Sequence, residues 1–374
     1  MADGMHIVTF NVPWPADYGG VIDIYYRLKA LHKAGVRLHL HCFTYGRPAA
    51  PELESLCSSV SYYRRNMSPL QHLSRRPFIV ASRDNTDLMK RLQTDRLPIM
   101  LEGVHCCSVL ENKAVTEDRC LIVRAHNIEA DYYSMLASAE HNVARKAYLS
   151  LEAAKLRRYE GILARADAVL AVSEADRDNI VALGAGNVHV VPCGHPYQTV
   201  SSLPGHSDYA LYHGNLSVPE NEAAAMELIN NVFAHLDRRL VVAGRDPSTR
   251  LRSLAARHTN VTLVPSPDDD TMARLIAEAQ VNVLITGQPT GLKLKLLYAL
   301  FSGRHCLVNS NMLQGTSLGQ LCTVADGWEA LRNAVDNLMD ADFGEGQLQQ
   351  RRQALQPYVT ANAIKPLLDI VAGA

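Results

Sequence analysis

Residues 287–309 read GQPTGLKLKLLYALFSGRHCLVN, and their pattern is the clearest indication of the fold class. The apolar run VNVLIT before it predicts a strand, and the pattern across 291–302 predicts a helix that Gly303 ends. A second strand, HCLVN, follows at once. Strand, loop, helix and strand in this order form the βαβ unit of a parallel sheet, so the stretch predicts an α/β fold.

The start of this predicted helix has the features of an anion site. Free backbone N–H groups and the positive end of the helix dipole attract anions there, and Gly291 has no Cβ to keep a phosphate away. Lys293 and Lys295 lie in the first turns, although lysines normally favour the other end of a helix. A bound diphosphate explains both lysines, and a solvated side chain is the alternative for either one.

The rest of the second half repeats this alternation. The strand patterns YALYHGN, RLVVAGR and NVTLVPS precede VNVLIT, with helical patterns across 219–236 and 269–279. Residues 330–374 are helical by pattern. The second half therefore predicts one doubly wound parallel sheet.

The first half has the same organisation. MHIVTF and VRLHLHCF enclose a helical pattern that stops at Gly35, and further apolar runs lie at 98–101, 120–124 and 168–172. Ser173 and the acid three residues later form a capping box for the helix after the last run. A second doubly wound parallel sheet follows from this pattern.

The chain length and one linker-like stretch of sequence predict two domains. A chain of 374 residues exceeds the usual size of one hydrophobic core, and CGHPYQTVSSLPGHSD reads as a linker with the boundary near 196–206. We expect an N-terminal domain at 1–197 and a C-terminal domain at 198–355. The remaining stretch, 356–374, predicts a helix that returns to the N-terminal domain.

Composition narrows the function classes. The net charge of −1 gives no field for nucleic acid, so no nucleic-acid partner is expected. The eight cysteines include no CxxC pair, and no zinc-like spacing is present. The start lacks the pattern of a secretion signal and no run reaches 18 apolar residues, so we expect a cytoplasmic location.

Several segments resemble glycosyltransferase family 4. The run from Gly291 to Val308 is similar to its donor-binding segment, DYGG at 17–20 resembles its glycine loop, and VRAHNIEADYY at 123–133 resembles the histidine segment of its mannosyl- and glucosyltransferases. LYHGNLSVPENEAA, VVAGRDP and VTLVPSPDDDTMARLIAEAQVNVLI follow in the family's order, so the likeness covers most of the chain. It implies a GT-B architecture, in which two Rossmann-like domains face a central cleft.

The resemblance also implies the donor-binding residues. Gly214 and Asn215 would approach the donor phosphates or sugar, Arg245 would lie near the diphosphate, and the backbone at Ser266 would meet the base. A surface arginine and a simple turn are the alternatives for the last two. The full implied set is Gly214, Asn215, Arg245, Ser266, Thr290, Gly291, Leu292, Lys293, Lys295 and Tyr298.

One departure from the family pattern affects this set. The family's two carboxylates, eight residues apart, would fall on Thr290 and Tyr298, so both acids are missing. A charged acceptor contributes about 1.5–3 kcal/mol per hydrogen bond. The loss implies weaker donor binding, a ribose contact from the Tyr298 hydroxyl, or a chain without catalysis. The alternative function is therefore a degenerate GT-B chain that acts as a non-catalytic binding or partner subunit.

The first half supplies the expected catalytic and acceptor residues. His126 ends a predicted strand, where parallel sheets place ligand groups, and the resemblance implies that it faces the reacting sugar. Glu129 is expected to orient it or to bind acceptor. Gly19 and Gly20 expose backbone N–H groups to a phosphate or the acceptor, or else form only a tight turn. A structural histidine is the alternative reading of His126.

Two charged segments remain. Asp268, Asp269 and Asp270 precede a helical pattern, so we expect helix capping and no metal site. Residues 62–83 hold five arginines and no acid. That segment predicts either a solvated loop or a peripheral contact with an anionic membrane or a pyrophosphate-linked acceptor.

Together these observations predict a glycosyltransferase that needs no metal. It would transfer a hexose from a UDP- or GDP-linked sugar to a glycan or lipid-linked acceptor, with retention, in polysaccharide biosynthesis, as the resemblance implies. A nicotinamide or flavin oxidoreductase would need GxGxxG after a strand, and that fingerprint is absent from the sequence. A GT-B sugar-nucleotide epimerase is the remaining rival.

Overall fold

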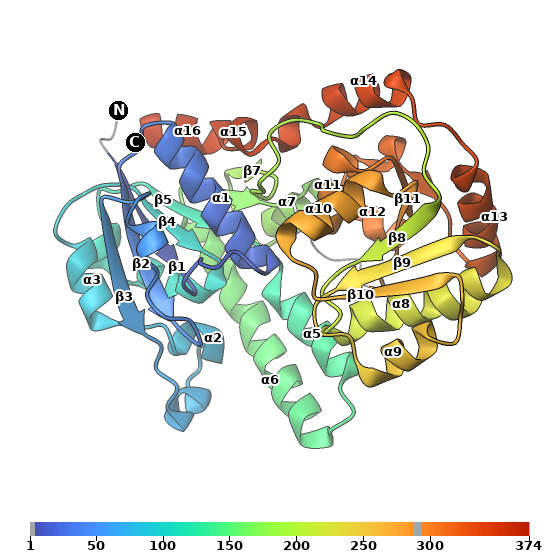
Figure 1. The fold of residues 1–374 in the computed structure, drawn as a ribbon. Coiled ribbons are helices and arrows are strands. Elements are labelled where there is room, and N and C mark those ends of the chain that lie inside the picture. Colours follow the sequence, from blue (N-terminus) through green and yellow to red (C-terminus); the bar gives the residue numbers. More distant parts are fainter. Residues whose placement is uncertain (1–3, 288–293, 374) are drawn as a thin grey trace. The chain divides into compact units, whose positions relative to one another are not determined.

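The computed structural model describes residues 4–287 and 294–373. The chain divides into two compact units, which we call unit 1, Met1–Pro196 with Thr360–Ala374, and unit 2, Tyr197–Val359 (Figure 1). Each unit contains one parallel sheet with helices on both faces. The prediction of two doubly wound parallel sheets is confirmed.

Unit 1 contains a seven-stranded sheet in the order β3-β2-β1-β4-β5-β6-β7. Every pairing in it is parallel. The direction of the order changes between β1 and β4, and the carboxyl ends of strands at such a switch point form the usual ligand site of this architecture. The strands are β1 (Met5–Thr9), β2 (Leu38–Thr44), β3 (Ser59–Arg64), β4 (Ile99–Glu102), β5 (Leu121–Arg124), β6 (Ala168–Ala171) and β7 (Val188–Val190).

Helices cover both faces of this sheet. Gly35, with φ of 83°, ends the first helix as predicted, and Ser173 caps α7 through the backbone N–H of Asp176. The helices are α1 (Gly19–Lys33), α2 (Phe78–Ala81), α3 (Thr86–Leu92), α4 (Lys113–Thr116), α5 (Glu129–Ala139), α6 (Val143–Tyr159), α7 (Glu174–Ala182), α15 (Thr360–Ala363) and α16 (Lys365–Ala372), with 3-10 turns η1 (Pro51–Leu53), η2 (Pro69–Leu73), η3 (Val104–Glu111) and η4 (Glu160–Arg165).

The C-terminal helix packs in the core of unit 1. Leu367 and Val371 of α16 are buried in the same cluster as Leu28 of α1 and Met5 of β1. Thr360 joins α15 to the end of the first segment, because its Oγ1 accepts from the His195 N–H and donates to the His195 carbonyl, both at 3.0 Å. The chain therefore completes the first core with its last residues.

Unit 2 contains a six-stranded parallel sheet in the order β10-β9-β8-β11-β12-β13, with its switch point between β8 and β11. Its strands are β8 (Tyr209–His213), β9 (Arg239–Gly244), β10 (Val261–Pro265), β11 (Val281–Leu284), β12 (His305–Val308) and β13 (Thr323–Val324). Its helices are α8 (Pro219–Asn231), α9 (Thr249–Ala255), α10 (Asp269–Glu278), α11 (Leu294–Ser302), α12 (Ser310–Leu313), α13 (Trp328–Met339) and α14 (Glu345–Ala354), with 3-10 turns η5 (Phe233–His235), η6 (Gly319–Leu321) and η7 (Gln356–Tyr358).

Strands β3 and β13 were not predicted from the sequence, and both lie at sheet edges. Five of the six residues of β3 are only partly buried or exposed, so its apolar pattern is weak. β13 has two residues, both exposed. An edge strand covered on one side needs no continuous apolar run, which is the signal that revealed the central strands. Across the described ranges, no helix is long and apolar enough to span a membrane.

Candidate functional site

Lys295 marks the switch point of the second sheet. Its Nζ lies 3.3 Å from Asn221 Oδ1 and 5.4 Å from the centre of the Tyr212 ring. Tyr212 is in β8 and Asn221 is in the first turns of α8, so the α11 lysine reaches the carboxyl end of β8. A cation is thereby fixed where parallel α/β sheets bind ligands.

The loop after β8 lies beside this lysine. Asn221 Nδ2 donates to the Asn215 carbonyl at 3.0 Å, and Asn215 Oδ1 accepts from the N–H and hydroxyl of Ser217. A Cβ on Gly244 would lie 1.9 Å from the Gly214 carbonyl oxygen, so only glycine allows the ends of β8 and β9 to approach this closely. Asn221 connects Gly214 and Asn215 to Lys295, and the sequence analysis did not select it.

The turn at Ser266 continues this edge of the sheet. The Ser266 N–H donates to the Gly244 carbonyl at 2.7 Å, and the Ser266 hydroxyl accepts from the Asp246 N–H at 3.1 Å. Both Asp246 and Ser266 have positive φ, at 50° and 49°. Arg245 lies between Gly244 and Asp246, which both bond to Ser266, and its own side chain is exposed. The structure therefore brings Gly214, Arg245 and Ser266 to the carboxyl ends of neighbouring strands.

An acidic residue that the sequence analysis missed lies at the same edge. The Glu220 carboxylate in the first turn of α8 accepts a short hydrogen bond from the Thr286 hydroxyl, directly after β11. Thr286 also exchanges two backbone hydrogen bonds with the Asn309 amide, at 3.2 and 2.8 Å. A cavity of about 350 Å³ adjoins Thr286 and Asn309. Glu220 stands within the PENEAA segment, where its acidity alone gave no signal of a site.

His213 ends β8 next to Lys295. Its side chain is 3% exposed, and its Nε2 has no hydrogen-bond partner in the described part of the chain. Burial, with a smaller contribution from Lys295, lowers the pKa of His213 to about 3. The ring is therefore neutral at physiological pH.

Other members of the expected donor set are placed differently. The ring of Tyr298 lies 5.1 Å from that of Tyr197 and packs on the cluster of Leu211, Val241 and Ile276. Thr290, Gly291, Leu292 and Lys293 lie outside the described residues.

A buried ionic network underlies His126 in unit 1. Asp23, Arg27, Glu102 and Arg124 are each 0–2% exposed. Arg27 donates to both oxygens of Asp23 at 2.9 Å and to both oxygens of Glu102 at 2.7 and 2.8 Å. Arg124 donates from Nε to Asp23 at 3.0 Å. Two carboxylates and two guanidiniums thus join α1 to the carboxyl ends of β4 and β5.

Charge pairing keeps these carboxyls ionised. Burial alone would raise the pKa of Asp23, but Arg124 and Arg27 hold it well below the ordinary value. Burial likewise opposes ionisation of Glu102, and the Arg27 guanidinium and the hydrogen bond from His126 lower its pKa. Full pairing of buried charges makes the network a rigid support for the residues above it.

His126 lies on this network with both ring nitrogens facing carboxylates. Its Nε2 is 2.9 Å from Glu102 and its Nδ1 is 3.4 Å from Asp23. The Phe10 ring contacts it edge-on at 5.5 Å, and the side chain is 11% exposed. The predicted strand-end position is correct, and the two carboxylates orient the ring. Sequence reasoning missed these two orienting acids.

Glu129 is buried in the first turn of α5 rather than presented at the surface. Burial and the neighbouring Glu160 raise the pKa of Glu129 to about 7, and burial raises that of Glu160 to about 7 as well. Glu160 accepts from the N–H of Ala130 at 3.1 Å and so caps α5. Glu129 is thus part of a buried acid pair.

The glycine loop forms the start of α1. Gly19 and Gly20 are its first two residues, no acidic residue lies in its first turn, and no side chain caps it. A Cβ on Gly20 would lie 2.9 Å from the Phe10 ring, so this glycine lets α1 approach the end of β1. Asp17 forms an ion pair with Arg47. The free N–H groups of α1 therefore point toward the carboxyl edge of the first sheet.

The aspartate run caps helix α10. Asp268 Oδ1 accepts from the Thr271 N–H at 2.8 Å, and Asp269 and Asp270 lie in the first turn of α10, so the capping prediction is confirmed. In the part of the chain that the structure covers, no three His, Cys, Asp or Glu side chains are grouped to hold a metal ion.

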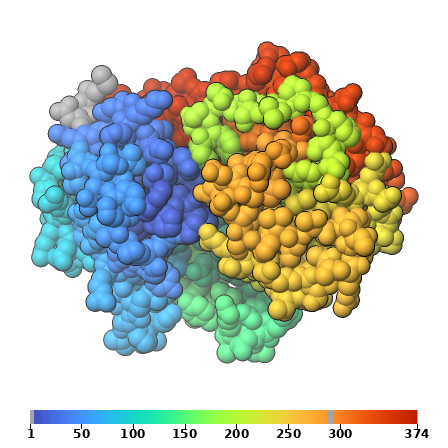
Figure 2. Space-filling view, in the orientation of Figure 1, coloured from blue at the N-terminus to red at the C-terminus, as the bar shows by residue number. Residues whose placement is uncertain are grey.

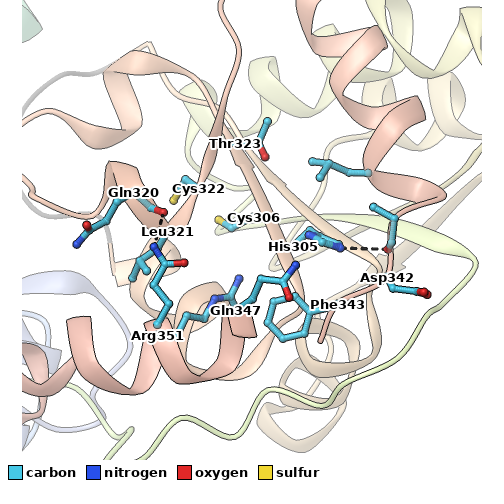
Figure 3. Close-up of a pocket in the computed structure, with 13 residues that line it drawn as sticks. His305, Cys306, Gln320, Leu321, Cys322, Thr323, Asp342, Phe343, Gln347 and Arg351 are labelled. Carbon is cyan, nitrogen blue, oxygen red and sulfur yellow. Dashed lines mark hydrogen bonds between the residues drawn. The ribbon is translucent and has the colours of Figure 1, made fainter. Parts of the chain in front are cut away.

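A pocket of about 360 Å³ lies at the opposite edge of the second sheet. Figure 3 shows His305 and Cys306 of β12 facing Arg351 and Phe343 across it, with Cys322 nearby. His305 begins β12, whereas the donor candidates follow the carboxyl ends of β8, β9 and β10. This pocket is separate from the candidate donor site.

The arginines of residues 62–83 do not form one surface. Arg83 is buried, Arg65 is partly buried over the rings of Tyr45 and Phe78, and Arg76 pairs with Asp84 and Glu111. Between them η2 carries two strongly exposed side chains, Leu70 at 71% and Leu73 at 82%. Figure 2 shows this blue segment as a projection of unit 1.

Solved structures similar to this chain are GT-B glycosyltransferases. A glycosyltransferase from Rickettsia africae aligns with a TM-score of 0.65 and 12% identity over 100% of this chain and 99% of its own. HepE from Anabaena in complex with UDP and glucose aligns with a TM-score of 0.61 and 13% identity, covering 99% and 97% of the two chains. Residues 19–197 match the model of Glycosyltransferase Family 4. This chain is a family 4-like glycosyltransferase with the GT-B fold.

One relative covers nearly all of the glycosyltransferase. It is an "Uncharacterized 44.6 kDa protein in cps region" of Klebsiella pneumoniae, 25% identical over 358 residues, which are 90% of this chain and 88% of the relative. The trehalose-phosphate synthase (UDP-forming) of Burkholderia vietnamiensis has a TM-score of 0.62 at 8% identity over 99% of this chain and 100% of its own. The structural likenesses show the fold alone.

Proposed function

We propose that this glycosyltransferase moves a hexose from a UDP- or GDP-linked donor to a glycan or lipid-linked acceptor, without a metal and with retention at the anomeric carbon. Unit 2 would hold the donor and unit 1 the acceptor. The complex of HepE with UDP and glucose favours a uridine donor. The cps-region relative favours a role in polysaccharide assembly.

The placement of Lys295 carries the proposal. Its ammonium lies 3.3 Å from Asn221 at the carboxyl end of β8, and Asn221 holds the Asn215 carbonyl. A diphosphate at this switch point would meet a fixed cation and the close-packed glycines Gly214 and Gly244. Lys295 would then neutralise the departing diphosphate, which is the task a metal ion performs in other transferases.

His126 would act at the reacting sugar. Its Nδ1 contact with Asp23 is the longer of the two, at 3.4 Å, and Asp23 already accepts from Arg27, Arg124 and the Gly194 N–H. A sugar hydroxyl can therefore replace this contact at small cost while Glu102 keeps Nε2 in place. Catalysis would rest on positioning and on stabilisation of the leaving group.

A membrane contact through η2 completes the proposal. Leu70 and Leu73 are exposed, and Arg64 and Arg75 flank them in sequence. Apolar side chains next to basic ones are the two signals that peripheral proteins combine to bind anionic bilayers. The protein would bind a lipid-linked acceptor at this surface.

A thermal shift screen tests the donor assignment. The protein would be heated with UDP, GDP, ADP or CMP and their sugar conjugates, without added metal. We expect one nucleoside diphosphate at saturation to raise Tm by a few degrees. If none of the nucleotides raised Tm, the donor site would be refuted. NMR of the product gives its anomeric configuration, and an inverted anomer would refute retention.

A further inference from the structure

Two arginines of unit 1 are held together at the carboxyl edge of the first sheet. Arg65 directly follows β3, and Arg83 follows α2 (Figure 1). Arg65 Nε donates to the Ser82 hydroxyl at 2.8 Å, and Ser82 is the residue before Arg83. Arg83 Nε donates to the Phe10 carbonyl at 2.9 Å, at the end of β1. Both guanidiniums are thus fixed beside the switch point.

Neither arginine is neutralised. Among the described residues, Arg65 and Arg83 form no ion pair, whereas the buried Arg27 and Arg124 each contact a carboxylate at 3.0 Å or less. Burial and then the charge of Arg65 lower the pKa of Arg83 to about 10, and burial lowers that of Arg65. Arg83 is therefore a buried cation with the partly buried Arg65 beside it, and no carboxylate of the described residues forms an ion pair with either.

The nearby acid does not serve as their counterion. Glu129 lies within electrostatic range of Arg83, yet its pKa is raised to about 7 by burial and by Glu160. A carboxyl that Arg83 paired with would have a lowered pKa instead, as Asp23 does.

Hydrogen bonds within the protein use only part of the Arg83 guanidinium. Its Nη1 donates to the Ile79 carbonyl at 2.7 Å and its Nε to Phe10, but its Nη2 has no acceptor in the covered part of the chain. The buried Arg351, which also lacks a carboxylate, differs: both of its Nη atoms donate to backbone carbonyls. Arg83 thus keeps its Nη2 group available, whereas both Nη atoms of Arg351 are engaged.

Two further groups of unit 1 converge on Phe10. The start of α1, where the Tyr18 side chain makes no capping bond, lies against it at Gly20, and the His105 ring lies 5.0 Å from its ring with a buried Nδ1 that has no partner among the described residues. Phe10 also accepts the bond from Arg83. Helix N–H groups, His105 and Arg83 thus adjoin one residue, and Arg65 reaches Arg83 through Ser82. Burial holds the pKa of His105 well below its usual range, so its ring can donate only as a neutral group, whereas the helix start and the arginines attract an anion.

We infer that Arg65 and Arg83 bind a phosphoryl group of the acceptor, next to the start of α1. This inference rests on the proposed function and specifies its acceptor as one that carries a phosphate or pyrophosphate. A guanidinium pairs with phosphoryl oxygens through two parallel N–H bonds, and two guanidiniums suit a group with several oxygens. The same chemistry is present in free phosphate and in a lipid-linked pyrophosphate.

Calorimetric titration with inorganic pyrophosphate tests the site. The titrations use the full chain at fixed ionic strength, with the donor site saturated by the nucleotide that gave the largest thermal shift. If no nucleotide binds, the donor proposal fails alone, and the titrations proceed on the Lys295→Ala protein. The variants are Arg65→Gln and, because Arg83 is buried, the conservative Arg83→Lys, checked for folding by circular dichroism. Arg37→Gln is the control, because Arg37 is exposed and precedes β2, at the amino ends of the strands.

We expect Arg65→Gln to weaken pyrophosphate binding at least about tenfold, and Arg37→Gln to leave it within about twofold. Arg83→Lys should also weaken binding, because lysine cannot form the paired contact. Equal affinity in wild type and Arg65→Gln would overturn the site. Tighter binding of glucuronate than of pyrophosphate would overturn the phosphoryl assignment. Transfer to a pyrophosphate-linked acceptor but not to its phosphate-free analogue would support the lipid source.

Discussion

Arg27 on α1 donates two hydrogen bonds to Glu102 at the end of β4, at 2.7 and 2.8 Å, across 75 residues of sequence. The same guanidinium holds Asp23, and Glu102 in turn holds His126. One buried cation therefore links the first helix, the switch-point strand and the proposed catalytic histidine. The stability of the first core and the orientation of His126 depend on the same contacts.

Arg27→Met should destabilise the protein strongly. The substitution leaves the buried Glu102 without a guanidinium and Asp23 with Arg124 alone, and breaking a buried pair in this way costs about 3–5 kcal/mol. Urea unfolding at pH 7 measures the loss. Lys29→Met on the exposed face of α1 is the control and should change stability by less than about 0.5 kcal/mol. Equal stabilities of the two variants would contradict the role of the network.

His126→Ala should lower kcat by about 10²–10³ and leave the Kd for the nucleotide within about twofold. The reason is that His126 lies in unit 1, on Glu102, whereas the proposed donor contacts lie in unit 2. Steady-state kinetics and calorimetry separate the two effects. His141→Ala, at an exposed histidine after α5, should match the wild type. If His126→Ala kept the wild-type kcat, the proposed catalytic role would be wrong and His126 would serve only as a structural part of the network.

Lys295→Ala should weaken binding of the nucleoside diphosphate at least about tenfold, because one charge-assisted contact is lost. Arg257→Ala removes an exposed cation of unit 2 away from the carboxyl ends of the strands and should bind as the wild type does. Calorimetry with the nucleotide from the thermal screen provides the comparison. If both variants bind equally well, the diphosphate does not contact Lys295.

The fold was predictable because its central strands are buried on both faces. Strands β4, β5 and β6 are apolar at nearly every position, and such runs stand out in a sequence. The C-terminus of α1 was predictable from Gly35, and the N-termini of α7 and α10 from the capping residues Ser173 and Asp268, because these signals act within a few residues. Edge strands such as β3 depend on tertiary pairing, and their composition does not reveal them.

The candidate site was predictable only where a residue follows a strand. His126 was selected because it follows a strand and because its segment resembles the family, whereas Gly214 and Ser266 were selected through the resemblance alone, and all three follow carboxyl ends of parallel strands. Asp23 and Arg27 lie within a helix and pair with residues about 75 to 170 positions away, so no local pattern marks them. Glu220 reaches the site from α8 through Thr286. Contacts of this kind require the three-dimensional structure.

The apolar tip of η2 should carry membrane binding. Replacing Leu70 and Leu73 together by serine removes two side chains that are 71% and 82% exposed, while the neighbouring arginines remain. Flotation with vesicles containing anionic lipid should fall severalfold, and flotation with neutral vesicles should be low for both proteins. Leu151→Ser, at a leucine of α6 that is 56% exposed, is the control. Unchanged flotation of the double variant, or none for the wild type, would refute the contact.

Glu129 and Glu160 should make the protein less stable as the pH rises from about 4.5 to about 7. In the folded state both carboxyls keep a proton up to about pH 7, because burial raises both pKa values and Glu160 adds to that of Glu129. The unfolded chain releases these protons near the ordinary value of 4.5, so the folded state binds more protons in between and stability falls with pH. Arg83, Asp131 and Arg157 also face this pair.

Glu160→Gln should remove part of this dependence. The amide oxygen can still accept from the Ala130 N–H, and the charge next to Glu129 is gone. We expect the variant to gain about 1–3 kcal/mol over the wild type between pH 5 and pH 8, from urea unfolding at both values. Glu117→Gln at an exposed acid should show no such gain. Parallel stability curves for wild type and Glu160→Gln would mean that the pair is ionised in the folded protein throughout this range.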